Sequence, residues 1–365
     1  MNLRVLVVDD TALFRKLVSD ALVAIPGVEV VGTASNGRLA LDRIGALRPD
    51  LITLDLEMPE MNGLQTLEAL QKAGSASGAI MLSSHTVRGG ELTMRALQLG
   101  AFDFITKPDG GSREDNLVQL RSGLASRIQA FGQRREIRQI LGAAPRRPPL
   151  PSPSPPKGVV ENRAAPARGR AVGPPIVLIG VSTGGPAALA QVLPALPAGF
   201  GAPVFIVQHM PPLFTEALAG NLQSRSAIGV HEARDGEIAE AGCAYIAPGG
   251  KHMKLASGPS GEIVVRIVDD PPENHCKPAV DVLFRSAANE FPRRSIAAIL
   301  TGMGHDGTDG LRHLKRTGCV SIAQDEATST VYGMPREAFL AGVVDQVLPL
   351  SQIAAALIRS VQEAR

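Results

Sequence analysis

Short apolar runs alternate with amphipathic stretches over the first 125 residues or so. The runs are rich in Val, Ile and Leu, which is typical of strands buried on both faces of a parallel sheet. We expect these strands at 3–8, 28–31, 51–54, 79–82 and 102–105. Apolar positions at helical spacing predict helices at 12–24, 39–47, 64–71, 92–99 and from 116 to about 140. Five strand–helix units in this order indicate one parallel sheet covered on both faces.

The same alternation returns after residue 173. Apolar runs predict strands at 176–179, 204–207, 296–300, 320–323 and 343–347, and two further strands around a turn within 244–255 and 261–269. Helices are expected just after Pro186 and at 213–222, 280–288, 332–340 and from 353 to the end. This pattern predicts a second α/β sheet.

The stretch 144–175 is dominated by Pro, Arg, Ala and Gly and has no hydrophobic period. Such a segment cannot bury a core, so we expect a solvated, semi-extended linker. The fold class is therefore α/β, with two doubly wound parallel-sheet domains. We divide the chain into a first domain at 1–125, a helix end and Pro/Arg-rich linker at 126–172, and a second domain at 173–365.

The composition narrows the possible functions. A length of 365 residues suits two domains, and 44% hydrophobic with 20% charged residues is an ordinary globular balance. The net charge of +2, with 3% aromatic residues and no Trp, argues against nucleic-acid binding. Three widely spaced cysteines predict neither a disulfide framework nor a zinc site. The N-terminal apolar run is too short to span a bilayer, so we expect a cytoplasmic protein without membrane insertion.

Polar residues collect where the strands of the first domain end. Asp9 and Asp10 follow the first strand, Asp55 ends the third, Ser83 the fourth and Lys107 the fifth. Because the carboxyl ends of parallel strands share one edge, these groups should converge. Three close carboxylates repel each other unless a cation lies among them, and oxygen ligands suit Mg²⁺. The cluster could also hold a phosphoryl group on one carboxylate.

The first domain resembles a response-regulator receiver, which is a flavodoxin-like fold. The similarity rests on VVDD at 7–10, LDLEMPEMNG at 54–63, LSSHT at 82–86 and TKP at 106–108. It implies that Asp55 accepts a phosphoryl group and that Asp10 and Asp55 ligate Mg²⁺, with Asp9 close by. It also implies phosphoryl sensing by Ser83 and Lys107, with Phe104 at the aromatic switch position.

The stretch 176–186, IVLIGVSTGGP, organises the second domain. It predicts a buried strand, a tight glycine-rich turn and a helix with Pro186 in its first turn. Ser182 could be a nucleophile beside backbone N–H groups, the glycines could cradle a phosphate, or the turn could simply need glycine for its geometry. The stretch matches neither the G-x-S-x-G motif nor a P-loop, so it leaves these alternatives open.

Two further residues favour the nucleophile. Ser182, His209 and Asp306 each follow an apolar strand, so a parallel sheet would bring them to one rim as the parts of a catalytic triad. His305 adjoins Asp306, and we prefer His209 as the base because a neighbour of the orienting acid usually points elsewhere. The remaining histidines are expected at the surface, in turns or at the substrate edge: His85, His231, His252, His275 and His313.

The second domain resembles the catalytic domain of the CheB family of chemotaxis protein-glutamate methylesterases, a Rossmann-like fold. The similarity rests on IGVSTGGP, VQHMP, YIAPGGKHM, PAVDVLF, LTGMGHDG and YGMPREA. It implies that Ser182 is the nucleophile, His209 the general base and Asp306 the orienting acid. We expect the oxyanion to meet backbone N–H groups of Thr183 and Met303, and we expect no cofactor for ester hydrolysis.

The resemblance further implies hydrolysis of glutamate methyl esters, and deamidation of glutamines, on the cytoplasmic helices of methyl-accepting chemoreceptors. The receiver would cover the esterase rim until a chemotaxis histidine kinase phosphorylates Asp55. Two rival outputs are a DNA-binding or non-catalytic module and a nucleotide-binding module. The near-neutral charge and the second α/β sheet disfavour the first. The second leaves His209 and Asp306 without a role.

Overall fold

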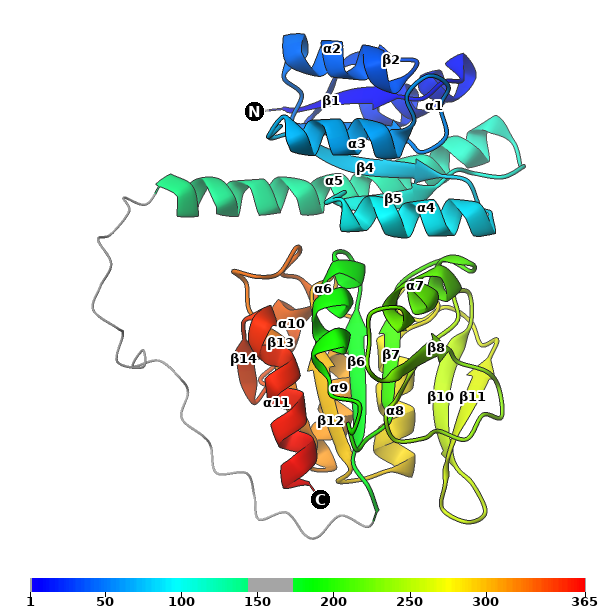
Figure 1. Cartoon of the computed structure of the whole chain (residues 1–365), viewed down its shortest axis with the longest axis vertical. Helices are drawn as coiled ribbons and strands as arrows, with labels where there is room; N and C mark the ends of the chain where they lie inside the picture. The colour runs from blue at the N-terminus through cyan, green and yellow to red at the C-terminus, as the bar shows by residue number, and fades with distance from the viewer. Residues whose placement is uncertain (1, 144–172, 365) are drawn as a thin grey trace.

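The computed structural model describes residues 2–143 and 173–364, which form two α/β domains (Figure 1). The first has a five-stranded parallel sheet in the order β2-β1-β3-β4-β5. Its strands are β1 (Leu3–Val8), β2 (Val28–Ala34), β3 (Leu51–Asp55), β4 (Gly78–Ser83) and β5 (Asp103–Thr106). Its helices are α1 (Ala12–Val23), α2 (Gly37–Leu47), α3 (Gly63–Lys72), α4 (Val87–Gln98) and α5 (Arg113–Ala143).

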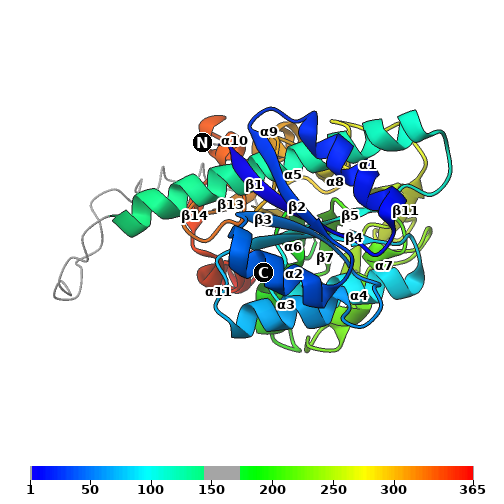
Figure 2. The ribbon, with the colours of Figure 1, turned by 90° about the horizontal axis from the view of Figure 1, so that it is seen from above.

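The side chains of β1 show how the sheet becomes covered on both faces. Val5 and Val7 pack with α1 and α5, whereas Leu6 and Val8 pack toward α2, α3 and α4. Figure 2 shows the two sets of helices on opposite sides of the sheet. Because both faces are buried, the central strands read as continuous apolar runs. Asn36 and Asn62 cap α2 and α3 by accepting hydrogen bonds from backbone N–H groups in the first turn.

The second domain has a seven-stranded parallel sheet in the order β14-β13-β12-β6-β7-β9-β8. Its strands are β6 (Ile176–Val181), β7 (Val204–Gln208), β8 (Gly229–Glu232), β9 (Cys243–Ile246), β12 (Ser295–Ile299), β13 (Val320–Gln324) and β14 (Gln346–Leu348). Beside it lies an antiparallel pair, β10 (His252–Ser257) and β11 (Ile263–Val268).

Helices cover both faces of this sheet as well. One face carries α6 (Gly185–Val192), α7 (Phe214–Gln223) and α11 (Leu350–Glu363), with a short 3₁₀ turn at Leu193–Ala195. The other carries α8 (Val280–Glu290), α9 (Thr308–Arg316), α10 (Met334–Leu340) and the β10–β11 pair. Among the described residues, no helix is long and apolar enough to cross a membrane.

Each sheet has one place where successive strands are added in opposite directions. In the first domain it lies between β1 and β3, and in the second between β6 and β12. Such switch points open a crevice at the carboxyl ends of the strands, where ligands bind in folds of this kind. Both groups of candidate residues found in the sequence lie at these two crevices.

The elements differ from the expected ones in a few places. Residues 308–316 form α9, and 229–232 form β8, neither of which the apolar pattern predicted. The last strand covers only Gln346–Leu348, because Val343 belongs to the turn after α10, where its side chain is buried and its N–H donates to Ala338 O (3.3 Å). The segment around 244–269 contributes β9 to the main sheet and only then the antiparallel pair. The strand expected at 102–105 corresponds to β5, and the helix expected from 116 corresponds to α5.

The two domains contact each other through the carboxyl edge of the second sheet. Phe104 of β5 stacks on Phe214 of α7, with ring centroids 4.8 Å apart and planes 18° from parallel. Gln98 of α4 donates a hydrogen bond to Asn221 (2.5 Å) and accepts one from Arg225 (3.0 Å). Figure 1 shows α4 and α5 of the first domain facing α6 and α7 of the second. The receiver-like domain therefore lies directly over the rim that carries Ser182.

Candidate active site

Ser182 follows β6 in a tight turn that leads into α6. Its backbone N–H donates to Thr301 O (3.0 Å), and its carbonyl accepts from Gly185 N (2.8 Å). Gly184 has φ +81°, a left-handed conformation that favours glycine. A Cβ on Gly302 would lie 2.7 Å from Ser182 Cβ, so only glycine lets the loop after β12 approach this closely. The sequence thus presents the hydroxyl on a sharp strand-to-helix turn.

His209 leaves the sheet beside Ser182. Val181 and Gln208 are paired residues of β6 and β7, and His209 N donates to Val181 O (3.1 Å). The His209 ring donates from Nε2 to Asp306 Oδ2 (2.7 Å). In the described parts of the chain the Ser182 hydroxyl makes no hydrogen bond, which leaves it available to an incoming group.

Asp306 is held by five hydrogen bonds. Besides His209, its donors are Val280 N (2.6 Å), Asp281 N (3.1 Å), Gly307 N (3.0 Å) and Asn274 Nδ2 (3.0 Å). Val280 and Asp281 open α8, so the carboxylate lies at the positive end of a helix dipole. Burial opposes the charge, yet the hydrogen bond and charge of His209 and the backbone donors lower the pKa of Asp306 to about 2.

Two further residues, Asn274 and Asp281, help to hold Asp306 in place. The sequence analysis assigned neither of them a role. Asn274 Nδ2 bridges Asp306 and Asp281 Oδ2 (2.8 Å), and Asp281 Oδ1 accepts from Gly310 N of α9 (2.6 Å). Burial, together with the charge of Asp306, raises the pKa of Asp281 to about 6. Asp281 lies in the PAVDVLF motif, so the sequence could have indicated a role for it. Asn274 lies in a loop that has no hydrophobic periodicity or motif to mark it.

The electrostatics of His209 favour its charged form. Burial of the ring opposes protonation, but the hydrogen bonds to Asp306 and to the Cys276 thiol outweigh it and raise the pKa of His209. Cys276 Sγ lies 3.6 Å from His209 Nδ1, the ring nitrogen that is not bonded to Asp306. The arrangement stabilises an imidazolium, the species that forms when a histidine takes a proton from a nucleophile.

Two backbone N–H groups near Ser182 have no hydrogen-bond partner among the described residues. Over residues 2–143 and 173–364, neither Thr183 N nor Met303 N donates a hydrogen bond. Met303 directly follows Gly302, which lies against Ser182. Thr183 is otherwise well fixed, because its carbonyl accepts from Thr301 Oγ1 (2.9 Å) and its hydroxyl donates to Asp103 Oδ2 of the first domain (3.0 Å). Unpaired donors beside a nucleophile can stabilise an oxyanion.

In the first domain, Asp9, Asp10 and Asp55 meet as expected, with one oxygen of each within 4.8 Å of the others. Lys107 Nζ lies 2.7 Å from both Asp9 Oδ2 and Asp55 Oδ2. Burial raises the pKa of Asp55 to about 6, and the neighbouring Lys107 opposes this rise. Burial lowers the pKa of Lys107, but the two carboxylates more than compensate and raise it. The all-oxygen donor set fits Mg²⁺.

The remaining candidates of the first domain point away from the carboxylates. The buried Ser83 hydroxyl donates to Gly89 O (3.1 Å) and accepts from Thr93 Oγ1 (2.8 Å), both of α4. Phe104 faces the second domain, where it stacks on Phe214. Ser83 and Phe104 thus connect the acidic crevice to α4 and to the domain contact.

The other histidines mostly lie where the sequence placed them, with one correction. His85, His275, His305 and His313 are exposed, and half-buried His231 bonds Glu237 on a turn. The expectation for His252 was wrong, because this residue is fully buried. Its ring nitrogens are hydrogen-bonded to Pro271 O (3.0 Å) and Ala279 N (3.1 Å). Because both nitrogens have partners, the ring can be buried without an unsatisfied polar atom, and the second bond fixes the chain just before α8.

Comparisons with known proteins match both domains. A model of the CheB methylesterase family matches residues 177–357, and a model of the response regulator receiver domain matches 5–119. A "Protein-glutamate methylesterase/protein-glutamine glutaminase" of Desulfotalea psychrophila is 47% identical, covering 99% of both chains. One of the same name from Bacillus subtilis is 44% identical, covering 100% of this chain and 99% of its own. The chain belongs to the CheB methylesterase family.

A solved structure of the Thermotoga maritima CheB methylesterase catalytic domain agrees with this assignment. It is 43% identical, with a TM-score of 0.51, and the match covers 52% of this chain and all of that one. The match therefore concerns the second domain. In this CheB-family chain the receiver domain precedes the catalytic domain and packs against it.

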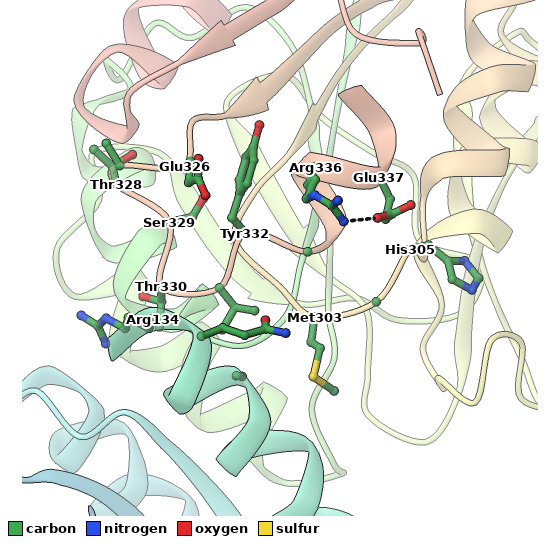
Figure 3. A pocket seen from close by; sticks show the side chains of 16 residues that line it. Arg134, Met303, His305, Glu326, Thr328, Ser329, Thr330, Tyr332, Arg336 and Glu337 are labelled. Atoms are coloured by element: carbon green, nitrogen blue, oxygen red, sulfur yellow. Dashed lines mark hydrogen bonds and ion pairs between the residues drawn. The ribbon is translucent and has the colours of Figure 1, made fainter. Parts of the chain in front are cut away.

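A cavity of about 790 Å³ opens beside Met303, between the two domains (Figure 3). Met303 and His305 line it from the loop after β12, Tyr332 from the segment before α10, and Arg336 from α10 itself. The wall on the receiver side is α5, which contributes Arg134 together with Ala130 and Gln133. Access to this side of the esterase rim is thus shaped by a helix of the receiver.

Proposed function

We propose that this chain hydrolyses glutamate methyl esters and deamidates glutamines on chemoreceptors, under control of its receiver domain. The relatives from Desulfotalea psychrophila and Bacillus subtilis are named for both activities, and they align over nearly the whole chain. The observation that carries the proposal is the His209 Nε2–Asp306 Oδ2 hydrogen bond at the rim where Ser182 leaves the neighbouring strand. A hydroxyl, an imidazole and an oriented carboxylate are the parts of a serine hydrolase.

The reaction follows from these roles. Ser182 Oγ attacks the ester carbonyl carbon while His209 Nδ1 takes the hydroxyl proton, and Asp306 stabilises the imidazolium. The N–H groups of Thr183 and Met303 donate to the oxyanion. His209 returns the proton to the leaving oxygen, and methanol departs from the acyl-enzyme. His209 then deprotonates a water molecule that attacks the acyl carbon, and it returns that proton to Ser182 Oγ as the acyl–oxygen bond breaks. The glutamic acid product loses its own proton to solvent, which leaves a glutamate carboxylate and the free Ser182 hydroxyl.

Glutamine deamidation uses the same steps. The leaving group is then ammonia, which takes its proton from His209, and hydrolysis of the same acyl-enzyme again yields glutamate. All of these steps are assigned to side chains and backbone groups of this chain, so we propose that ester hydrolysis needs no cofactor.

We propose Asp55 as the phosphoryl acceptor of the receiver, with a chemotaxis histidine kinase as donor. Asp10 and Asp55 would hold Mg²⁺, with Asp9 beside them, because their oxygens lie together. Bound Mg²⁺ would neutralise charge on the phosphoryl oxygens. Lys107, already paired with Asp55, would contact the phosphoryl group, and Ser83 would turn toward it from its bonds to α4.

The control of the esterase would act through the domain contact. Thr183, next to the nucleophile, is bonded to Asp103 of β5, and Phe104 of the same strand stacks on α7. In the contact seen here the receiver therefore restrains the rim and walls the cavity beside Met303. A phosphoryl group on Asp55 that shifts Ser83, α4 and Phe104 would loosen this contact and open the rim.

The proposed partners are thus the cytoplasmic helices of methyl-accepting chemoreceptors as substrate and a histidine kinase as phospho-donor. Both act in the cytoplasm, where we place this protein. We propose no nucleic-acid partner, in keeping with the net charge of +2.

The deciding experiment measures methanol release from methylated receptor membranes, with and without a small phospho-donor and Mg²⁺. We expect release that rises with the phospho-donor and falls by about 10³-fold or more in Ser182→Ala. The variant should unfold at the wild-type temperature, since the hydroxyl has no hydrogen bond among the described residues. Release by Ser182→Ala at near the wild-type rate would overturn the nucleophile.

A further inference from the structure

Cys276 lies beside the proposed catalytic base and has no task in the mechanism above. Its Sγ is 3.6 Å from His209 Nδ1, and its other contact is to Asn274 O (3.4 Å). The thiol is half-buried and so is reached from solvent. His209 and Cys276 are 67 residues apart, which is why the spacing of the cysteines predicted no zinc site. The fold creates a pair of metal-binding atoms that the sequence does not show.

The geometry of this pair suits a tetrahedral zinc ion. Zn²⁺ binds nitrogen at about 2.0–2.1 Å and thiolate sulfur at about 2.3 Å, which places the two ligands about 3.5 Å apart at a tetrahedral angle. The observed separation of 3.6 Å needs no movement of the backbone. A ring nitrogen of His209, Cys276 Sγ and an oxygen of Asp306 lie within 4.8 Å of one another, and Asp306 Oδ2 is bonded to the other ring nitrogen, Nε2.

We propose that His209 Nδ1 and Cys276 Sγ form an inhibitory binding site for Zn²⁺. Asp306 orients the ring from Nε2, which is the carboxylate–histidine–zinc arrangement common in zinc proteins. Two protein ligands leave the other positions to water, so binding is reversible by a chelator. The Cys276 thiol gives up its proton to solvent when the metal binds, because the thiolate is the ligand.

Zinc at this site stops the esterase because it occupies the nitrogen lone pair that takes the Ser182 proton. This inhibition rests on the proposed function, whereas the binding itself does not. The receiver cluster of Asp9, Asp10 and Asp55 offers only oxygen ligands and suits a hard cation. A thiolate signature therefore distinguishes the Cys276 site from the receiver site within one full-length chain.

The binding test uses Co²⁺ as a spectroscopic substitute for Zn²⁺ on the full-length protein with saturating Mg²⁺. We expect a thiolate-to-cobalt absorption band in the wild type that Zn²⁺ displaces. The band should be absent in Cys276→Ser and weakened in His209→Ala. The matched control is Cys243→Ser, since Cys243 is also half-buried but lies at the start of β9, and it should keep the band.

The inhibition test measures methanol release against Zn²⁺ concentration, with each variant referred to its own zinc-free rate. We expect Cys276→Ser to need at least about tenfold more Zn²⁺ for half-inhibition than the wild type or Cys243→Ser. A chelator should restore the wild-type rate.

The outcomes separate the two proposals. Absence of the thiolate–cobalt band in the wild type, or a band that Cys276→Ser retains, overturns the site. Equal zinc sensitivity of the wild type and Cys276→Ser overturns the inhibitory role. Absence of methanol release before any zinc is added counts against the proposed function, and the cobalt band then still decides the metal site.

Discussion

The two crevices of this chain are built alike and treat their carboxylates in opposite ways. Each lies at the switch point of a parallel sheet and collects residues that end neighbouring strands. Asp306 receives five hydrogen bonds and has its pKa lowered to about 2. Asp55 has the Lys107 ion pair and one long bond from Glu57 N (3.4 Å), and burial raises its pKa to about 6.

The difference indicates that the donors around a carboxylate set its pKa even where two folds place it alike. A fully satisfied carboxylate is a fixed charge that can orient another group. A buried carboxylate with few partners keeps oxygen lone pairs for a metal or a phosphoryl group. Substitutions at both crevices test this contrast.

Asp306→Asn should lower kcat for ester hydrolysis by about 10⁴-fold, because an amide can no longer hold the imidazole in the proton-accepting tautomer. Methanol release under phosphorylating conditions measures the loss. Asp309→Asn is the matched control, since Asp309 is an exposed acid of α9 three residues away, and it should retain wild-type activity. A mild loss in Asp306→Asn would show that the five bonds around this carboxylate serve stability rather than catalysis.

Asp55→Asn should keep basal hydrolysis and lose the stimulation by a phospho-donor, which we expect to be about 5–150-fold in the wild type, as is typical of coupled sites. The side chain stays buried in the same place, but an amide cannot accept the phosphoryl group. Methanol release with and without the donor gives the ratio. Stimulation of the variant equal to that of the wild type would place the acceptor elsewhere.

Asp103→Ala should raise basal, unphosphorylated activity by about fivefold, because it removes the bond to Thr183 across the domain contact, and one hydrogen bond is worth about 1 kcal/mol. Activity with the phospho-donor should change less, since in the proposed mechanism phosphorylation already loosens the contact. Arg127 loses its ion pair with Asp103 in this variant, so Arg127→Ala controls for that effect. Unchanged basal activity in Asp103→Ala would mean that the contact imposes no restraint.

The pH dependence of kcat/KM tests the electrostatics of His209. As the proposed base, His209 must be neutral to take a proton, and hydrogen bonds to Asp306 and Cys276 raise its pKa. Activity should therefore rise with pH through the alkaline range rather than near the ordinary pKa of histidine. Cys276→Ala removes the contribution of the thiol, so the rising limb should move to lower pH by about one unit or less. The profiles are measured with a chelator present, and a limb that moves upward would contradict this account.

Much of this architecture could be read from the sequence because strands buried on both faces leave an unmistakable apolar run. The ends of those runs placed Ser182, His209 and Asp306 on one rim and Asp9, Asp55 and Lys107 on another. α9 escaped prediction because its short sequence, TDGLRHLKR, is mostly polar and buries only one narrow stripe.

The support around Asp306 could not be predicted in the same way. Asn274 and Cys276 come from a loop between β11 and α8, where no periodicity connects sequence position to spatial position. His252 was expected at the surface, in a turn or at the substrate edge, and only the fold supplies the two backbone partners that satisfy its buried ring. Hydrogen bonds between single polar side chains and groups far away in the sequence cannot be predicted from the hydrophobic pattern.

The continuity of α5 has a mechanical consequence. This helix of 31 residues begins after β5, in the receiver, and reaches the cavity wall at Arg134 without a break. At 1.5 Å per residue, the distance along its axis from Arg113 to Arg134 is about 32 Å. A tilt of about 5° at its start then displaces Arg134 by about 3 Å, roughly the length of a hydrogen bond. A small rotation of the receiver at the start of α5 would therefore change the contacts that Arg134 makes at the esterase cavity.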